Sequence, residues 1–346
     1  MEPQAPHLES TVEPRVLQRA LSAYREPRLA RSVFELAITV IPFGAFWFLT
    51  WASVNAGHWF GLLLAVPAAG FLVRLFMIQH DCGHGSFFPS RRANDWVGRA
   101  LGVLTLTPYD FWRHSHALHH AHSGNLDRSR VGSIDTLSVR EYDALSRPQR
   151  LRYRLYRHPL VLFGLGPVYL FMLSNRLPVG FMRAGRMPWW STMGTNAAIV
   201  LLATAMISLV GAGTFFVVYL PIAVLAGAIG VWLFYVQHQF ENTRWAHDDE
   251  WSFHETALYG SSYYELPAPL RWLTANIGVH HVHHLASRIP FYRLPEVLRD
   301  HPWLRETSRI TLRQSLRCVR LALWDEERQR LVPFQRAERE MPSLSV

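Results

Sequence analysis

Three clusters of histidines in this chain have the spacing of metal ligands. They are separated by long stretches and read His80-Asp81-Cys82-Gly83-His84, His116-Ala117-Leu118-His119-His120 and His280-His281-Val282-His283-His284. Spacings of i, i+3 and i+4 place side chains on one face of a helix, so each cluster can direct several imidazoles to one point. An imidazole-rich site suits iron, copper or zinc. Because four ligands saturate one tetrahedral zinc ion, eight histidines at these spacings predict two metal ions.

A structural role is the alternative for any single histidine. A buried imidazole needs only a hydrogen-bond partner, so we assign no chemistry to His7, His58, His158 and His301. Cys82 lies inside the first cluster, but the histidine spacing is complete without it, and a packing role is expected. Three clusters at ligand spacing are a different pattern, and they favour a metal site.

Four apolar runs would position these clusters. Each is close to the ~20 residues that cross a bilayer core, and they cover residues 33–54, 59–78, 192–210 and 214–236. Short uncharged turns join them into two hairpins, and Arg74, near the end of the second run, is expected to reach the membrane interface. The predicted fold is an all-α integral membrane protein with four transmembrane helices and a helical cap that holds a histidine-ligated di-metal centre.

The charge distribution predicts which side of the membrane carries the cap. The formal net charge is +9, and the arginine-rich parts are the N-terminus, residues 91–186 and the chain after Arg244. All three fall on one side if the four runs span, and the positive-inside rule makes that side the cytoplasm. We therefore expect the histidine clusters and both termini to be cytoplasmic, at the plasma (inner) membrane if the source is bacterial. No nucleic-acid-binding signature accompanies the charge, so no nucleic-acid partner is expected.

The predicted organisation has three parts. They are a cytoplasmic N-terminal segment (1–32), a membrane domain (33–300) with cytoplasmic histidine regions at 79–190 and 237–300, and a cytoplasmic tail (301–346). Two apolar pieces, residues 96–107 and 159–173, are short for a span and are expected to lie in the interface, although a six-span arrangement that uses the second piece is an alternative. A charged helix is expected near residues 310–331.

The clusters and their flanking residues resemble the three histidine boxes of the integral-membrane fatty acid desaturases, in particular the acyl-lipid omega-6 (delta-12) and omega-3 group. The matching stretches are His80–Phe88, Trp112–His120 and His280–Leu285, and the resemblance covers about residues 33–299. In that family a non-haem di-iron centre activates dioxygen and removes two hydrogens from an acyl chain. The resemblance therefore implies a dioxygen-dependent desaturase that introduces a cis double bond into a lipid-linked fatty acyl chain.

The resemblance also implies the metal ligands. The boxes supply His80, His84, His116, His119, His120, His280, His283 and His284, and His238 matches the placement of a ninth histidine. The extra histidines His114, His122 and His281 are expected to form hydrogen bonds around the site. Carboxylates that could orient ligand imidazoles are Asp81, Asp110, Asp127 and Glu241, each of which could instead be a surface charge or a helix cap.

Cofactors and partners follow from the same resemblance. We expect two iron ions, dioxygen as co-substrate, and zinc as a possible substitute in a purified sample. The sequence lacks a dinucleotide-binding glycine loop, and its two cysteines cannot hold an iron–sulfur cluster, so no residue is predicted to bind an organic cofactor and the electron donor should be external. A ferredoxin, or a cytochrome b5-like protein with its reductase, would fit.

Two other functions remain open from the sequence. A hydroxylase, an acetylenase, or a carotenoid or sphingolipid oxidase would use similar boxes. A metal-binding or metal-transport protein would be expected to carry ligands within its spans, which these runs almost lack. Aromatic residues that could line an acyl-chain tunnel, or simply anchor the membrane interface, are Phe111, Trp112, Trp232 and Tyr235.

Overall fold

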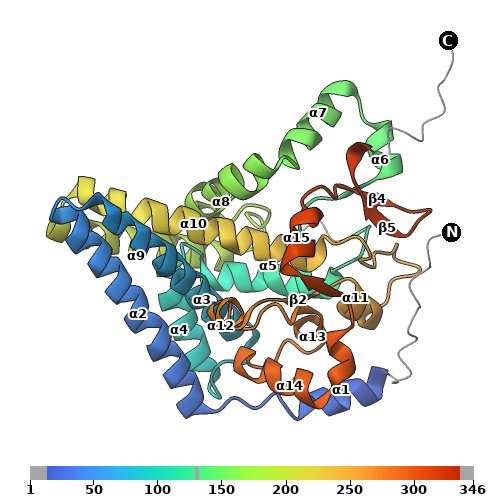
Figure 1. Ribbon diagram of the computed structural model, residues 1–346, viewed down its shortest axis with the longest axis horizontal. Coiled ribbons are helices and arrows are strands. Elements are labelled where there is room, and N and C mark those ends of the chain that lie inside the picture. The colour runs from blue at the N-terminus through green and yellow to red at the C-terminus, as the bar shows by residue number, and fades with distance from the viewer. Residues whose placement is uncertain (1–13, 129–131, 336–346) are drawn as a thin grey trace.

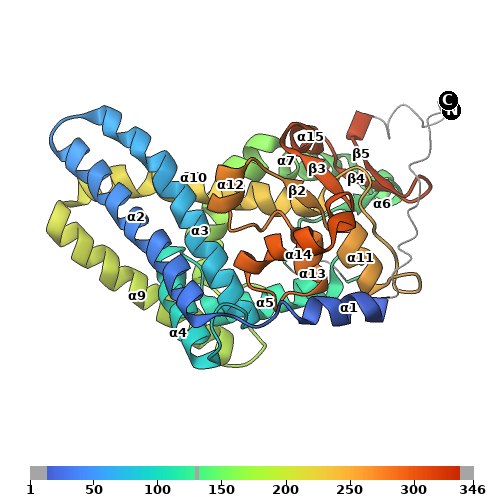
Figure 2. The same cartoon turned by 60° about the horizontal axis from the view of Figure 1, so that its bottom comes forward.

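The computed structural model describes residues 14–128 and 132–335, most of which are helical (Figure 1). Four segments are long and apolar enough to cross a membrane: α2 (Leu29–Asn55), η1 with α3 (Trp59–Leu64 and Ala65–His84), α9 (Met187–Val210) and α10 (Ala212–His238). The four predicted apolar runs are therefore helices, and each helix extends beyond its run at one or both ends. In Figure 2 these helices lie on one side of the molecule and the short elements of the cap on the other.

The helix that carries the first histidine cluster, α3, is the most enclosed of the four. In the most apolar stretch of residues 59–84, 61% of the residues are buried within the protein, whereas none is buried in the corresponding stretch of α9. Arg74 of α3 is buried against Glu35 of α2, and both side chains are 1% exposed. The prediction that Arg74 reaches the membrane interface is thus wrong, because a carboxylate inside the protein compensates its charge.

The second cluster is brought to α3 by a helical hairpin. α4 (Arg91–Leu104) begins before the apolar piece at 96–107 and contains most of it, and α5 (Tyr109–His122) follows. The hydroxyl of Tyr109 donates to the carbonyl of Cys82 at 2.8 Å, which fixes the start of α5 against the end of α3. A Cβ at Gly98 would lie 2.2 Å from the Tyr109 ring, so only glycine admits this contact.

Short elements fill the chain between α5 and α9. They are α6 (Val139–Ala144), α7 (Arg147–Tyr156), η2 (Val161–Leu165), α8 (Gly166–Val168), η3 (Tyr169–Leu173) and η4 (Ser174–Arg176). α7 and the segment 161–176 meet at 56°, as in a broken span or a re-entrant loop, and the predicted apolar piece 159–173 lies mostly in the second arm. This arm packs closely on α10, where a Cβ at Gly227 would lie 3.1 Å from Pro167.

The cap combines short helices with small sheets. Its helices are α11 (Phe253–Tyr259), α12 (Ala268–Leu273), α13 (His280–Leu285), η5 (Phe291–Arg293), α14 (Leu294–Asp300), η6 (Pro302–Arg305) and α15 (Leu312–Cys318), and α1 (Pro14–Ser22) lies beside them (Figures 1 and 2). Its strands are β1 (Leu137–Ser138), β2 (Tyr263–Glu265), β3 (Arg309–Thr311), β4 (Leu323–Asp325) and β5 (Arg330–Val332). β2 pairs in parallel with β3, and β4 lies between parallel β1 and antiparallel β5.

The prediction of a charged helix near residues 310–331 is wrong for most of that segment. Only α15 is helical there, and the chain then forms the β4–β5 hairpin. The Asp325 carboxylate accepts the backbone N–H groups of Glu327 and Arg328 at 3.1 Å each, and Gln329 has φ of +51°. This side-chain-capped turn stops the helix and returns the chain.

Candidate metal centre

The first histidine cluster occupies the last turns of α3. His80 and His84 are one turn apart, and Gly85, at φ of +67°, ends the helix directly after them. The Ser86 N–H and hydroxyl both donate to the Asp81 carbonyl at 3.0 Å, which secures this end. Gly85 therefore ends the apolar helix directly after His84, and both imidazoles lie at the end of α3 that faces the short helices and sheets of the cap.

The other ligand-type histidines come from three further helices. α5 presents His116, His119 and His120, and α10 ends on His238. The six-residue helix α13 carries the third cluster, and every residue from His280 to Leu285 is buried. The helical spacings of the sequence are thus present, and four helices direct imidazoles into the same region.

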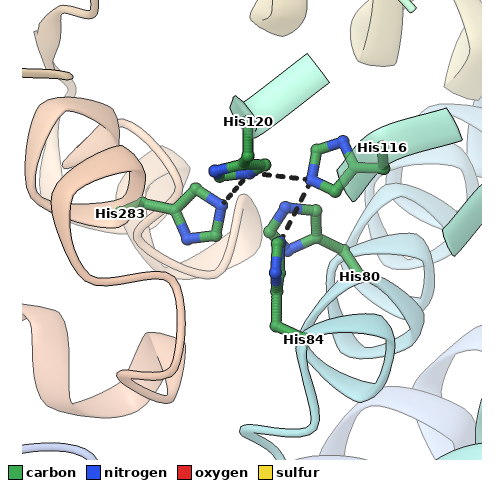
Figure 3. A group of neighbouring side chains, drawn as sticks. All are labelled: His80, His84, His116, His120 and His283. Carbon is green, nitrogen blue, oxygen red and sulfur yellow. Dashed lines mark hydrogen bonds between the residues drawn. The ribbon is translucent and has the colours of Figure 1, made fainter. Parts of the chain in front are cut away.

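One group of imidazoles draws on all three clusters. It consists of His80, His84, His116, His120 and His283, whose candidate ligand nitrogens all lie within 4.8 Å of one another. Figure 3 shows their rings facing a common centre from α3, α5 and α13. The Nε2 atom of His116 lies 3.1 Å from Nε2 of both His84 and His120, and His120 Nε2 lies 3.2 Å from His283 Nε2.

A second group lies beside the first and is fully buried. It consists of His119, His238, His280 and His284, again with candidate ligand nitrogens within 4.8 Å of one another. The Nε2 atom of His238 lies 3.1 Å from that of His119 and 3.0 Å from that of His280. The rings of His120 and His284 stack at 4.1 Å and connect the two groups. Every histidine predicted as a metal ligand therefore falls in one of two adjacent groups.

The donor arrangement fits metal ions. Two imidazoles that bind one ion at right angles, through bonds of ~2.1 Å, place their nitrogens about 3.0 Å apart. A ring nitrogen carries one proton or one lone pair, so His116 Nε2 can complete a hydrogen bond with only one of its two neighbours. The Nε2 atom of His284 is buried without a hydrogen-bond partner among the described residues. A cation in each group would accept these convergent lone pairs.

Hydrogen bonds on the far ring nitrogens orient two histidines of the second group. His238 Nδ1 donates to the Gly260 carbonyl at 3.3 Å, which leaves the Nε2 lone pair toward the group. His119 Nδ1 lies 3.2 Å from the Ser133 hydroxyl. Neither Gly260 nor Ser133 could be predicted from the sequence, since both lie outside the clusters and a carbonyl contact has no residue-type signature.

Burial keeps the cap histidines in the neutral form that binds metal. It lowers the pKa well below the usual range for His116, His119, His120, His280, His283 and His284. Neighbouring imidazoles lower these pKa values further, because a second positive charge in the group would be repelled. At neutral pH each of these six rings is therefore neutral and has one nitrogen lone pair that can bind metal.

The candidate orienting carboxylates have different surroundings. Asp81 Oδ1 lies 3.2 Å from His80 Nδ1, inside the protein. Asp110 instead pairs with Arg99 at 2.9 Å, and Glu241 with Arg330 at 3.4 Å. Asp127 accepts from His247 at 2.9 Å. Within the described chain the structure brings only Asp81 to the histidine groups, whereas the other three carboxylates have their partners elsewhere.

The extra histidines also lie outside both groups. His281 Nε2 donates to the Leu304 carbonyl at 2.9 Å, and burial lowers the pKa of His281 to about 4. His122 Nδ1 lies 3.1 Å from the Leu118 carbonyl, and the His114 ring packs edge-on against Phe181. The contacts of His281 and His114 join α13 and α5 to neighbouring segments, whereas the His122 contact lies within α5.

Two of the candidate tunnel aromatics differ sharply in position. Trp112 stacks on His116, with ring centroids 4.6 Å apart, and therefore borders the first group. The Tyr235 hydroxyl donates to the carbonyls of Cys318 and Leu321 and accepts from Arg157. Tyr235 is thereby engaged in the cap core, whereas Trp112 lies directly against a candidate metal ligand.

A small cavity adjoins the second group on its cap side. It has a volume of about 20 Å³, and its lining includes His119, His238, Ser133, Gln239 and Trp245. Polar and apolar groups both line it, and its size suits a single water molecule.

The apolar helices and the paired histidine groups define a helical membrane protein whose clustered imidazoles could hold two metal ions. Comparison with known proteins then places the chain in a family. The model of the family described as fatty acid desaturase matches residues 55–315, and the chain belongs to that family.

Individual relatives agree with this assignment. A fatty acid desaturase of Bacillus subtilis is 45% identical over 320 residues, which cover 92% of this chain and 90% of the relative. An sn-1 acyl-lipid omega-3 desaturase (ferredoxin) of Synechocystis sp. is 30% identical over 78% of this chain and 74% of its own length. An sn-1 oleoyl-lipid 12-desaturase of Synechocystis sp. is 28% identical over 64% of this chain and 63% of its own length. The chain is a desaturase enzyme of fatty acyl chains, and the predicted family is confirmed.

Proposed function

We propose that the two histidine groups hold two iron ions and that the enzyme uses dioxygen to introduce a cis double bond into a lipid-linked acyl chain. The observation that carries the proposal is the convergence of the nine predicted histidines into two adjacent groups of metal-ligand spacing. The iron would supply the activation of dioxygen that removes hydrogen from an unactivated carbon. In balance, two adjacent CH₂ groups become CH=CH, and dioxygen takes up these two hydrogens, two electrons and two protons to form two waters.

The protein's own contribution is to position the chain and to keep the site dry. α3 and α10 end on His84 and His238, so an acyl chain lying among the apolar helices would be directed toward the groups. Trp112, stacked on His116, would limit where the chain passes. Because orientation of the reacting carbons relative to the site determines which carbons react, these contacts would set the position of the double bond.

The arrangement supports one orientation in the membrane. With α2, α3, α9 and α10 as four spans, both histidine groups would lie on one side of the membrane, together with α1 and the β4–β5 hairpin. The arginine-rich segments lie there too, which would make it the cytoplasmic side. The predicted regions 1–32, 79–190, 237–300 and 301–346 would then be cytoplasmic, except where α2, α3, α9 and α10 extend into them.

The electron donor would be a separate protein. The sequence carries no nucleotide-binding glycine loop and only two cysteines. The Synechocystis omega-3 relative is described with ferredoxin, so a ferredoxin is the first donor to supply, with a cytochrome b5-like protein and its reductase as the second. Zinc could replace iron in a purified sample, since imidazole ligands suit both metals.

The product of the reaction tests this proposal. Membranes from a host that expresses the chain with a ferredoxin system should contain a new unsaturated acyl chain, and mass spectrometry would locate its double bond. The His119→Ala variant, expressed at the same level, should lack it. An oxygenated acyl chain would instead identify a hydroxylase. Unchanged lipids with an iron-loaded enzyme and a reduced donor would reject an acyl-lipid substrate.

A further inference from the structure

A buried ion pair lies among the apolar helices near the first metal group. Arg74 of α3 and Glu35 of α2 form it, and both side chains are 1% exposed. Glu35 also pairs, at 2.6 Å, with Arg31 one turn earlier on α2, whose side chain is 51% exposed. Arg74 precedes His84 by ten residues, which at 1.5 Å per residue is about 15 Å along the helix. Charges this far inside an apolar helix bundle are costly and usually serve function. The contacts of Arg74 therefore need an explanation beyond neutralisation by Glu35.

Those contacts reach from the apolar helices into the cap. Arg74 donates from Nε to the Thr39 hydroxyl at 3.1 Å and from a terminal nitrogen to the Trp272 carbonyl. Its guanidinium lies over the Trp272 ring at 4.2 Å and the Phe291 ring at 5.1 Å. One side chain thus joins α2 and α3 to α12 and to the segment that follows the third histidine cluster.

Phe291 is held at a second point on the same helix. Its backbone N–H donates to Asp81 Oδ2 at 2.7 Å, while Asp81 Oδ1 lies 3.2 Å from His80 Nδ1. Arg74 and Asp81 are seven residues apart and so lie on one face of α3. The Phe291 ring is held by Arg74 and its backbone by Asp81, the residue that orients His80.

The neighbouring tyrosine anchors the same segment to α2. The Tyr292 hydroxyl accepts from the Arg28 N–H at 2.9 Å and lies 3.2 Å from the Ser32 hydroxyl. The Phe291 ring also stacks on Phe87, which follows the first cluster, at 6.0 Å. The chain that leaves α13 is therefore tied to both helices of the first hairpin.

We propose that Arg74 and Glu35 are positioning residues for the first metal group. They hold Phe291 on α3, so that its N–H occupies one oxygen of Asp81 and the other oxygen faces His80 Nδ1. The His80 ring is then held with Nε2 toward the group, and α13, which supplies His283, is held at a fixed place beside α3. This inference rests on the proposed function, because it takes His80 and His283 as ligands.

Three variants separate positioning from general stability. Arg74→Lys keeps the charge opposite Glu35 but loses the planar contacts with Trp272 and Phe291. The double variant Glu35→Gln/Arg74→Met removes both charges, so no unpaired charge remains buried. Phe291→Leu keeps the backbone N–H and removes the ring. Arg99→Lys, at a partly exposed ion pair with Asp110, is the matched control.

The full-length proteins, reconstituted in lipid, would be measured for total transition metal per chain, turnover and thermal midpoint. We expect Arg74→Lys and Phe291→Leu to retain a midpoint close to that of the wild type, to lose about one metal equivalent, and to turn over on the order of 10- to 100-fold more slowly, as when metal-orienting contacts are lost. The Arg99→Lys control should match the wild type.

Two results would overturn the inference. One is wild-type metal content and turnover in Arg74→Lys and Phe291→Leu. The other is a loss of metal that occurs only in variants whose thermal midpoint also falls. If the double variant does not fold, the two single variants decide. A wild-type protein that binds no metal would contradict the proposed function itself. Full metal loading in the wild type and in every variant would contradict only the positioning role of Arg74 and Glu35.

Discussion

The Nε2 atoms of His119 and His238 lie 3.1 Å apart, although 119 residues separate them in the chain. His119 comes from α5 and His238 from the last position of α10, and both rings are buried. This pair is the point at which the second apolar hairpin meets the second histidine cluster. It gives His238 a specific role: it completes a group that the three clusters alone would leave with three histidines.

Replacement of His238 tests that role. We expect His238→Ala to lose at least one metal equivalent and to lower turnover below detection, because three imidazoles would remain in the second group. Metal analysis beside lipid analysis would measure both. His122→Ala, outside both groups, is the control and should retain metal. Full activity of His238→Ala would remove it from the ligand set.

The carboxylates Asp81 and Asp110 should respond differently to the same change. In Asp81→Asn the new amide can still accept the Phe291 N–H, but its NH₂ would face His80 Nδ1 and favour the tautomer protonated at Nε2. We expect turnover to fall on the order of 10- to 100-fold. Asp110→Asn affects a surface ion pair with Arg99 and should stay within about twofold of the wild type. Equal losses in the two variants would contradict the orienting role of Asp81.

His281 lies within the third cluster but should be structural. Its Nε2 donates to the Leu304 carbonyl, and burial lowers the pKa of the ring to about 4. His281→Leu would leave that carbonyl unpaired, at a cost of about 1–3 kcal/mol. The thermal midpoint should fall while metal per chain stays unchanged. Loss of a metal equivalent without loss of stability would place His281 among the ligands.

The sequence predicted the helices and the nine histidines because both depend on local spacing. It did not predict which histidines form each of the two groups. Neighbours such as His119 and His120 belong to different groups, and this depends on how α5, α10 and α13 pack together. Arg74 was misjudged because its partner Glu35 lies 39 residues away. The C-terminal helix was misjudged because the turn at Asp325 and the pairing of β4 with β5 outweigh helical propensity.

The His247 contacts predict a modest pH dependence of stability. Hydrogen bonding to the Asp127 carboxylate raises the pKa of His247 above its usual value, and Glu326 adds to the effect. The folded form binds the proton more tightly, so this contribution is present below the unfolded pKa of about 6.5 and is lost as the pH rises through the raised pKa. The midpoint difference between the wild type and His247→Gln should be larger at pH 5.5 than at pH 8.5. Because the ring is half exposed, the difference should be small, and a larger difference at pH 8.5 would contradict the assignment.

If the two histidine groups each hold one metal ion, the number of metal ions per purified chain will show it. Iron, zinc and copper would be measured together on protein purified in detergent, for the wild type and for His116→Ala and His238→Ala, one from each group. We expect two metal ions per chain in the wild type and about one in each variant. A wild type with a single ion, or variants that both retain two, would contradict it.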